Sequence, residues 1–463
     1  MSRPGRSLLG FAVSALVAAC GARSTLRDEG AGGAGDGGAA GTTTSTTTSS
    51  STGPGGAEVG CNVLYLSGDP ISLDEVADEH ESRPRLVPAT EDASLVSVAL
   101  GRQMAEGPAS PPIRIVHAEF APWGEWPSSL GQEYQVFWSG GDSYAVAPAA
   151  PGSQPGLAAL FYLPTGDFPS DMYLAPLVKA QEEYDWYPEG VQWDAWEPAW
   201  ATALARGSSG HLAAYQLGLG GGRGPDTHLS LALVDATAGV KVIDHVACAD
   251  ARFPAETVPV KGGFLVATAS GRPFGTCSLG DEIPGPADEI QVVRVDEATG
   301  EMVLAATFEE PDPLAHIALA RGAEGAWLVW QNDGSSALQP PPVQAVRLDE
   351  SGGVAGPVFQ VTSDGETTGP FAAAALGEKL AVAWVDASDP SFPAIRVELF
   401  DEAGALVTST SVLLGPAWIY EPSLSLLPSP DGSKLLLSWP DIDSSGAAVS
   451  RVRVARFTCA EGV

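Results

Sequence analysis

The chain has 463 residues, of which 57 are acidic and 24 basic, giving a formal net charge of −33. A field of that sign repels nucleic acid and anionic lipid headgroups, which excludes polyanion binding as the main function. With 44 % hydrophobic residues the chain has enough apolar side chains to bury a sizeable core.

The first twenty residues predict export. Arg3 and Arg6 precede an apolar run over residues 8–19, which has the charge and length of a signal peptide. Twelve residues are too few for a transmembrane helix, which needs about 20.

The apolar run ends in Leu16-Val17-Ala18-Ala19-Cys20, which resembles a bacterial lipobox. The resemblance implies that residues 1–19 are removed and that Cys20 carries lipid as the first mature residue. Gly21, in place of Asp, implies export to the outer membrane. We therefore expect a cell-envelope lipoprotein whose first partner is the membrane, in the periplasmic or surface leaflet.

Residues 30–56 are all Gly, Ala, Ser or Thr except Asp36 and Pro54, so they have nothing to bury. We predict a disordered tether over residues 20–60 and a folded domain over residues 61–463. The tether's composition resembles that of lipoproteins from myxobacteria.

The folded region contains two internal repeats. An apolar strand followed by Asp and a turn with Gly recurs at Asp235, Asp296, Asp349 and Asp401, with steps of 61, 53 and 52 residues. A second strand pattern ends in Trp330, Trp384 and Trp439, and residues 134–138 look like an earlier copy ending in Trp138. Repeats of this length, with hairpin turns and alternating apolar strands, are typical of β-propeller blades.

The pattern predicts an all-β fold, a single β-propeller of four-stranded blades near residues 111–178, 198–250, 255–310, 314–364, 369–415 and 421–459. Six blades are favoured. The alternatives are seven blades, if residues 61–110 form more than a strand and a loop, or paired β-sandwiches. The last blade lacks a strand, which residues 94–100 or 62–66 would supply from the amino-terminal side. Residues 429–439, which begin Ser-Pro-Asp-Gly, resemble the repeat of TolB-type propellers, and this resemblance implies the fold class and no activity.

Cys20 aside, four cysteines remain, which permit three pairings in an oxidising compartment. We favour Cys61 with Cys459, which bracket the folded region, and Cys248 with Cys277, on neighbouring strands. No CxxC motif and no His/Cys metal spacing is present, and the six histidines show no ligand pattern.

An aromatic and acidic segment over residues 181–200 is the candidate ligand-binding site. It is expected at the end of the propeller that carries the loops between second and third strands and the connections between blades. Aromatic rings flanked by carboxylates suit carbohydrate or cationic ligands. The alternative is that the rings pack as a lid or fill a gap beside the first blade. The candidate residues are Tyr184, Asp185, Trp186, Glu189, Trp193, Asp194 and Trp196.

No P-loop, HExxH or GxSxG motif is present, and no cofactor is expected to be required. Asp441 and Asp443 have the spacing of a calcium-loop opening, so Ca²⁺ is the one metal considered, although the distal Glu of an EF-hand is missing.

The sequence thus favours a monomeric, non-catalytic binding or scaffold protein of the cell envelope. It would present an acidic, Trp-rich face to a glycan, a peptide or an envelope protein. The alternative is a carbohydrate-active enzyme that uses carboxylates on the same face.

Overall fold

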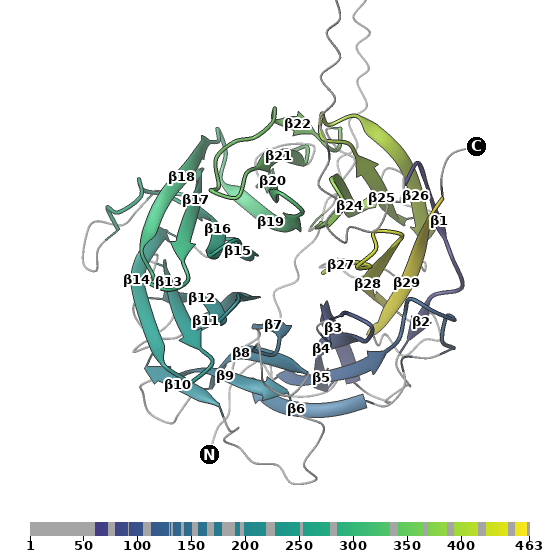
Figure 1. Ribbon diagram of the computed structural model, residues 1–463, viewed down its shortest axis with the longest axis horizontal. Coiled ribbons are helices and arrows are strands. Elements are labelled where there is room, and N and C mark those ends of the chain that lie inside the picture. Colours follow the sequence, from purple (N-terminus) through teal and green to yellow (C-terminus); the bar gives the residue numbers. More distant parts are fainter. Residues whose placement is uncertain are drawn as a thin grey trace, which may run out of the picture. The chain divides into compact units, whose positions relative to one another are not determined.

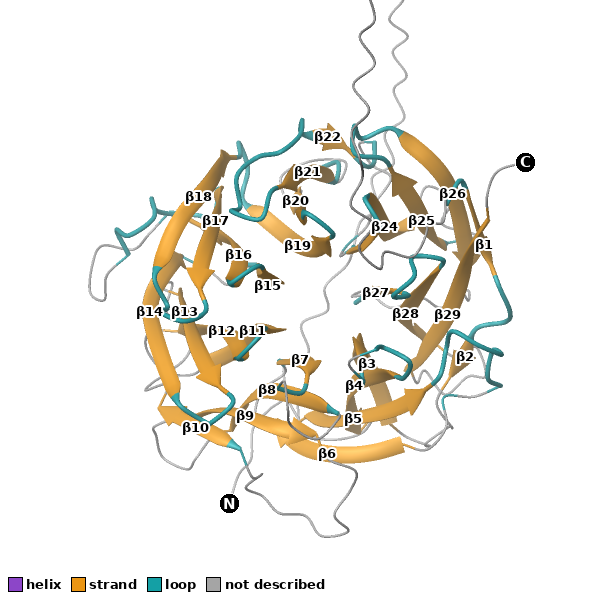
Figure 2. Cartoon of the chain, viewed as in Figure 1, coloured by secondary structure: helices purple, strands orange, loops and turns teal. Residues whose placement is uncertain are grey.

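A computed structural model gives the fold, and all of the residues that it describes lie in one compact unit, Gly55–Val463. The described residues are 61–72, 79–90, 92–104, 113–128, 130, 133–139, 143–150, 156–163, 171–177, 190–194, 199–218, 227–250, 253–277, 285–333, 341–363, 369, 371–386, 393–414, 423–442 and 450–460. Among them the regular structure is entirely strand (Figure 2). None of these residues forms a helix long and apolar enough to cross a membrane.

Seven antiparallel sheets are arranged around a ring, as Figure 1 shows, and each has four strands in radial order apart from one short addition. The first four blades contain β3 (Glu79–Pro88), β4 (Val96–Met104), β5 (Ile113–Phe120) and β6 (Glu133–Ser139); β7 (Tyr144–Pro148), β8 (Leu157–Leu163), β9 (Asp171–Leu177) and β10 (Val191–Asp194); β11 (Ala199–Arg206), β12 (Gly210–Gly218), β13 (Thr227–Asp235) and β14 (Val240–Ala249); and β15 (Ala255–Val260), β16 (Gly263–Ser270), β17 (Glu289–Asp296) and β18 (Met302–Glu309).

The remaining three blades complete the ring. They contain β19 (Leu314–Gly322), β20 (Gly325–Asn332), β21 (Gln344–Leu348) and β22 (Phe359–Gln360); β23 (Ala372–Leu376), β24 (Lys379–Asp386), β25 (Ala394–Phe400) and β26 (Leu406–Leu413); and β27 (Ser425–Pro428), β28 (Lys434–Ile442) and β29 (Ser450–Ala460) with β1 (Val63–Leu66) and the short β2 (Ile71–Ser72). The structure is a seven-bladed β-propeller.

The favoured count of six blades was wrong and the alternative of seven blades is confirmed, because residues 61–110 contain the strands β3 and β4 and the stretch assigned to one blade over residues 111–178 belongs to two. Strands β5 and β6 complete a blade that begins at β3, and β7 to β10 form the next. These two blades lack the short Asp-Gly hairpin of the later ones, since long connections over residues 121–132 and 178–190 replace it. Trp138 lies on β6, an outermost strand, so residues 134–138 do not match the second-strand pattern.

The ring is closed by an amino-terminal strand, and β1 pairs with β29 along its whole length, with Leu64 opposite Cys459. The Cys61–Cys459 disulfide joins the two ends of the ring, with Cα atoms 4.9 Å apart. The closing strand is therefore residues 63–66, and of the alternative stretch 94–100, residues 96–100 belong to β4 instead. Strand β1 is therefore the outermost strand of the last blade, and with it this blade has all four strands.

The repeated tryptophans lie in the core between blades. Trp330, Trp384 and Trp439 are on second strands β20, β24 and β28, and each exposes 2 % or less of its surface. Alternation along a strand directs successive side chains to the two faces of a blade, and both faces are covered by neighbours. The buried second strands, such as Gly325–Asn332, consequently read as continuous apolar runs.

The repeated aspartates hold the hairpins between third and fourth strands. Asp349 Oδ1 accepts hydrogen bonds from the backbone N–H groups of Ser351 (2.8 Å) and Gly353 (3.0 Å). Asp235 and Asp401 accept equivalent bonds in their own hairpins. Gly352 adopts a φ of 86°, a conformation that glycine takes at little cost.

Candidate binding site

The two ends of the propeller differ in their connections. The end that carries the first-to-second and third-to-fourth strand turns, here called the turn end, has several very short links. The opposite end, here called the loop end, carries the links between second and third strands and between blades, and several of these links are long. Turn-end links include residues 207–209, 261–262, 323–324 and 377–378, whereas loop-end links include residues 271–288, 333–343, 361–371 and 414–424. Long loops on a rigid frame are the usual place for binding residues.

The aromatic segment is divided by a strand that the sequence pattern did not reveal. Strand β10 pairs with β9 from Val191 to Asp194. The connection before β10, residues 178–190, therefore belongs to the turn end, and the connection after it, residues 195–198, to the loop end. The expectation that the whole segment lies at one end is corrected accordingly. Tyr184, Asp185, Trp186, Glu189 and Trp196 lie outside the described residues.

Trp193 is a core residue. It lies on β10, exposes 7 % of its surface and contacts Tyr215 with ring centroids 5.9 Å apart. It belongs to the apolar cluster shared by the second and third blades, which also contains Leu160 and Met172. Its ring is therefore unavailable for stacking on a ligand. Asp194 ends the same strand, and its side chain lies outside the described part of the chain.

A carboxyl group with a perturbed pKa lies beside the propeller axis. The innermost strands β3, β7, β11, β15, β19, β23 and β27 surround this axis (Figure 1). Each begins where the connection from the preceding blade arrives, so their first residues lie at the loop end. Glu256 is the second residue of β15. Burial raises the pKa of its carboxyl to about 7, and the positive charge of Arg85 on β3 opposes that rise.

The arginines of β3 are positioned by a bulge. The register of the β3–β4 pair shifts between Ser82 and Arg85, and Arg83 adopts a φ of 52°. The hydroxyl of Tyr144 on the next blade donates to the Arg83 carbonyl at 2.5 Å and anchors this irregular backbone. Bulges re-aim side chains and are frequent beside functional sites. Arg83 and Arg85 are thus placed near the axis of a strongly acidic protein.

The candidate site on the propeller axis therefore centres on Glu256, near the loop end of β15, with Arg83 and Arg85 in the middle of β3. Half-buried Trp200, the second residue of β11, also lies near the loop end of its strand. An ionisable carboxyl, guanidinium donors and an indole can bind hydroxyl-rich ligands through hydrogen bonds and apolar stacking. Sequence patterns do not indicate this group, because its members are far apart along the chain. They approach the same axis only because their strands are the innermost strands of three different blades.

One of the two candidate calcium ligands, Asp441, lies beside an arginine. Asp441 lies on β28, and its Oδ2 is 3.4 Å from Nε of Arg453 on β29. This guanidinium competes with a cation for the carboxylate. Asp443 lies outside the described residues, so a calcium site at this pair stays a prediction.

The second disulfide has a histidine beside it. Cys248 and Cys277 are joined, with Cα atoms 5.9 Å apart, as the sequence predicted. Nδ1 of His228 lies 3.1 Å from Cys277 Sγ. The lack of a His/Cys spacing motif in the sequence therefore did not reveal this cluster, because its three residues come from two blades and meet only in the folded chain.

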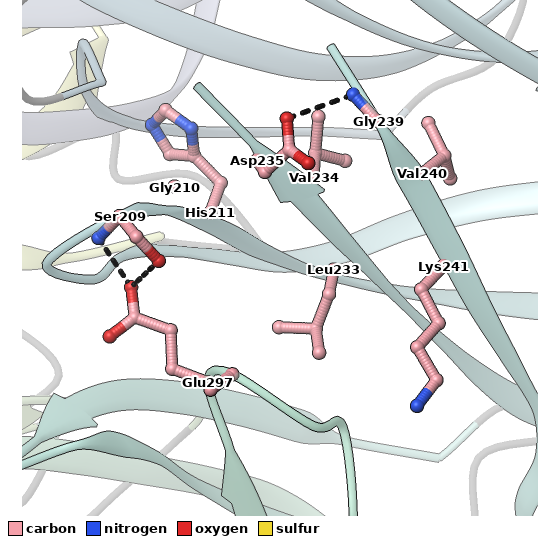
Figure 3. Close-up of a pocket in the computed structure, with 11 residues that line it drawn as sticks. Ser209, Gly210, His211, Leu233, Val234, Asp235, Gly239, Val240, Lys241 and Glu297 are labelled. Carbon is pink, nitrogen blue, oxygen red and sulfur yellow. Dashed lines mark hydrogen bonds between the residues drawn. The ribbon is translucent and has the colours of Figure 1, made fainter. Parts of the chain in front are cut away.

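A hollow at the turn end lies between the third and fourth blades and is lined by Ser209, His211, Asp235, Lys241 and Glu297, among others (Figure 3). Its polar groups bind one another. The Glu297 carboxylate accepts hydrogen bonds from Ser208 Oγ (2.6 Å) and from Ser209 N (2.6 Å), and Lys241 Nζ donates to the Thr299 carbonyl. His211 contacts the Pro148 carbonyl at 2.8 Å. The polar residues around this hollow therefore connect neighbouring blades through hydrogen bonds.

No protein-family model matches the chain, and no curated protein matches its sequence significantly. The chain is similar in structure to a protein of unknown function from Dyadobacter fermentans, with 10 % identity, a TM-score of 0.42 and coverage of 86 % of this chain and 99 % of that one.

The chain is also similar to the α-L-arabinofuranosidase of Fusarium graminearum bound to arabinobiose, with 10 % identity, a TM-score of 0.45 and coverage of 85 % and 97 %. A further similar structure is the subtype N11 neuraminidase-like protein of A/flat-faced bat/Peru/033/2010, with 10 % identity, a TM-score of 0.42 and coverage of 88 % and 96 %. Because the sequence identities are 10 % and the TM-scores are below 0.5, no activity or ligand of these proteins is assigned to this chain.

Proposed function

We propose that this protein is a non-catalytic glycan-binding propeller of the cell envelope, and that the glycan binds at the loop end of the axis. The observation that carries the proposal is Glu256 on the innermost strand β15, because burial raises the pKa of its carboxyl to about 7 against the opposing charge of Arg85. A strongly perturbed carboxyl with a specific charge partner marks a candidate functional site. A peptide or a protein ligand is the alternative within this function.

The site's chemistry fits sugar hydroxyls. The carboxylate of Glu256 accepts hydrogen bonds from hydroxyl groups, and the guanidinium groups of Arg83 and Arg85 donate to hydroxyl and ring oxygens. The loop end also carries several long connections, which would supply ligand-specific contacts around the axis.

The test is binding of the purified protein to an array of neutral and acidic oligosaccharides, followed by titration of the strongest ligand. Glu256→Gln should weaken binding by at least about tenfold, since a charge-assisted hydrogen bond is lost. Glu301→Gln, at an exposed hairpin position of the turn end, is the matched control. An array without any glycan signal, or equal binding by both variants, would overturn the proposal.

A glycan-hydrolysing activity is the second candidate function, because a general acid working near neutral pH needs a raised pKa such as that of Glu256. Hydrolysis also requires a second carboxylate placed across the scissile bond. Incubating the array ligands with the protein and analysing the products tests it. Turnover that Glu256→Gln abolishes would replace the binding function by an enzymatic one.

The envelope location rests on the segment ending in Cys20, which lies outside the described residues. Lipid on Cys20 would hold the protein on a membrane, with residues 20–60 as the tether. Cys20→Ser should abolish incorporation of labelled fatty acid and release the protein from the membrane fraction. Labelled fatty acid that persists in this variant would contradict the anchor.

A further inference from the structure

The Cys248–Cys277 disulfide lies within a group of metal-ligating side chains. His228 is on β13, Cys248 is directly opposite it on β14, and Cys277 follows β16 in the next blade. One ligand atom from each of these three residues lies within 4.8 Å of the other two. Among the residues that the structure describes, no other three His, Cys, Asp or Glu side chains are gathered in this way.

The frame around this group is held by contacts other than the disulfide. The Cys248 carbonyl accepts hydrogen bonds from Gly271 N (2.8 Å) and Ser270 Oγ (3.2 Å), which tie β14 to the fourth blade. His228 and Cys248 are both nearly fully buried, at 3 % and 2 % exposure, while Cys277 is partly exposed. The three side chains would therefore stay close together if the bond between the sulfur atoms were broken.

A second histidine packs against the first. His245 lies at a bulge of the β13–β14 pair with a φ of 57°, a conformation that non-glycine residues adopt rarely. Its ring meets that of His228 edge-on, with centroids 4.9 Å apart. Its Nδ1 atom is buried and has no hydrogen-bond partner in the described part of the chain. The strained backbone thus holds a second imidazole next to the group.

We propose that Cys248, Cys277 and His228 form a zinc site when their disulfide is reduced, so that the bond is a reversible redox lock on that site. Two thiolates and one imidazole nitrogen are ligands that Zn²⁺ takes in proteins, with a fourth position left for water or another donor. Zinc needs ligand atoms about 2.0–2.3 Å from the ion. Sulfur and nitrogen atoms around one ion then lie within the 4.8 Å span already present.

The reaction that opens the lock is thiol–disulfide exchange with a dithiol. One thiolate of the dithiol attacks the more accessible Cys277 sulfur, the bond to Cys248 breaks, and Cys248 leaves as a thiolate. The second thiol of the reductant then releases Cys277, and the dithiol becomes a disulfide. Two electrons and two protons pass to the cysteines, and zinc binding displaces those two protons.

The Cys61–Cys459 disulfide serves as an internal control, because none of the described His, Asp or Glu side chains completes a metal-binding group with it. We propose zinc binding only for the pair that has His228 beside it. Reduction of the whole protein frees all four cysteines, so the experiment must distinguish the two pairs.

The first experiment titrates Co²⁺, a spectroscopic substitute for Zn²⁺, into the full chain after reduction with dithiothreitol and its anaerobic removal. We expect one equivalent to bind with thiolate charge-transfer and tetrahedral visible bands, which Zn²⁺ then displaces. Cys248→Ser should abolish these bands, and His228→Ala should weaken binding by at least about tenfold. His316→Ala, a histidine of another blade, should leave binding unchanged. Full bands in the Cys248→Ser variant would overturn the proposal.

The second experiment remains informative if reduction loosens the fold. The protein is equilibrated in mixtures of oxidised and reduced dithiol with and without Zn²⁺, and the free thiol at each cysteine is measured by alkylation and peptide mass analysis. Zinc that binds only the reduced form must raise the midpoint potential of Cys248–Cys277, leave that of Cys61–Cys459 unchanged, and lose its effect in His228→Ala. A midpoint potential of Cys248–Cys277 that zinc does not shift would contradict the site.

Discussion

Glu256 is a carboxylic acid whose surroundings oppose its charge. Its pKa is raised from 4.5 to about 7 by burial, and Arg85 compensates only part of that effect. This group, which costs stability when it is ionised, lies near the loop end of the innermost strand β15. Trp193 differs from Glu256, because it was expected to contact a ligand and is instead part of the hydrophobic core.

The ionisation of Glu256 gives a pH-dependent prediction. Its pKa is higher in the folded than in the unfolded chain, so its contribution to stability is fully present below about pH 4.5 and is lost as the pH rises through about 7. Glu256→Gln should therefore raise the free energy of unfolding by up to about 3 kcal/mol at pH 8 and change it little at pH 4. Urea unfolding at both pH values measures this. A Gln variant that is less stable at pH 8 than at pH 4, relative to the wild type, would contradict a raised pKa of this half-buried carboxyl in the folded chain.

Trp193 gives a prediction about packing. Trp193→Ala should lower the free energy of unfolding by about 3 kcal/mol, because the indole contacts Tyr215 and the surrounding apolar cluster. Tyr65→Ala, an aromatic residue that is 47 % exposed on β1, should lose less than about 1 kcal/mol. Denaturant unfolding of the two variants compares them, and equal losses would show that Trp193 is not in the core.

At the scale of the element, the hairpins that follow third strands join neighbouring blades. In each of three hairpins a Glu follows the turn aspartate, and Glu297 and Glu350 reach turns of the preceding blade. Glu350 accepts from Lys261 N at 2.9 Å and from Arg321 at 2.6 Å. The sequence showed the hairpins and the role of their aspartates and glycines. It did not show that the adjacent glutamates bind across blades, since that depends on how two blades sit together.

The hydrogen bonds of Glu297 to the preceding blade give a prediction whose pH dependence is opposite to that of Glu256. Burial by itself raises the pKa of Glu297, but hydrogen bonds from Ser208 and Ser209 outweigh it and lower the pKa below its usual value. The stabilisation is therefore present above the unfolded pKa and is lost as the pH falls through the lower, folded value. Glu297→Gln should cost about 1 kcal/mol at pH 7 and nothing at pH 2.

Thermal unfolding at the two pH values checks this, with Glu301→Gln of the same hairpin as the control. A cost that is equal at both pH values would mean that the carboxylate charge plays no part in connecting the two blades.

At the scale of the whole molecule, the sequence predicted the propeller class, the closure by an amino-terminal strand and both disulfides. It favoured six blades and left seven as the alternative, because the first two blades have no short Asp-Gly hairpin to mark them. It also missed the Glu256 and His228 groups. Strand patterns record which faces are buried, whereas these groups depend on how residues of different blades lie together in the folded ring.

The ring closure gives a prediction that compares the two disulfides. Cys61 and Cys459 are separated by 398 residues in sequence, and Cys248 and Cys277 by 29. If the bridges act by restricting the unfolded chain, replacing both cysteines of the first pair by Ser should cost about 5 kcal/mol, against about 3–4 kcal/mol for the second. Denaturant unfolding of the two double variants measures the difference. A larger loss for the second pair would show that local packing decides the contribution of a bridge.

The central claim is that a ligand binds at the loop end of the axis through Glu256. The most direct test is calorimetric titration of the strongest glycan from the array at pH values from 5.5 to 8.5, with the wild type and with Glu256→Gln. The claim predicts that wild-type affinity rises as the pH passes about 7, where the carboxyl ionises and can accept a hydroxyl hydrogen bond, and that the variant binds weakly at every pH. Equal affinities for the two proteins across the range would contradict it.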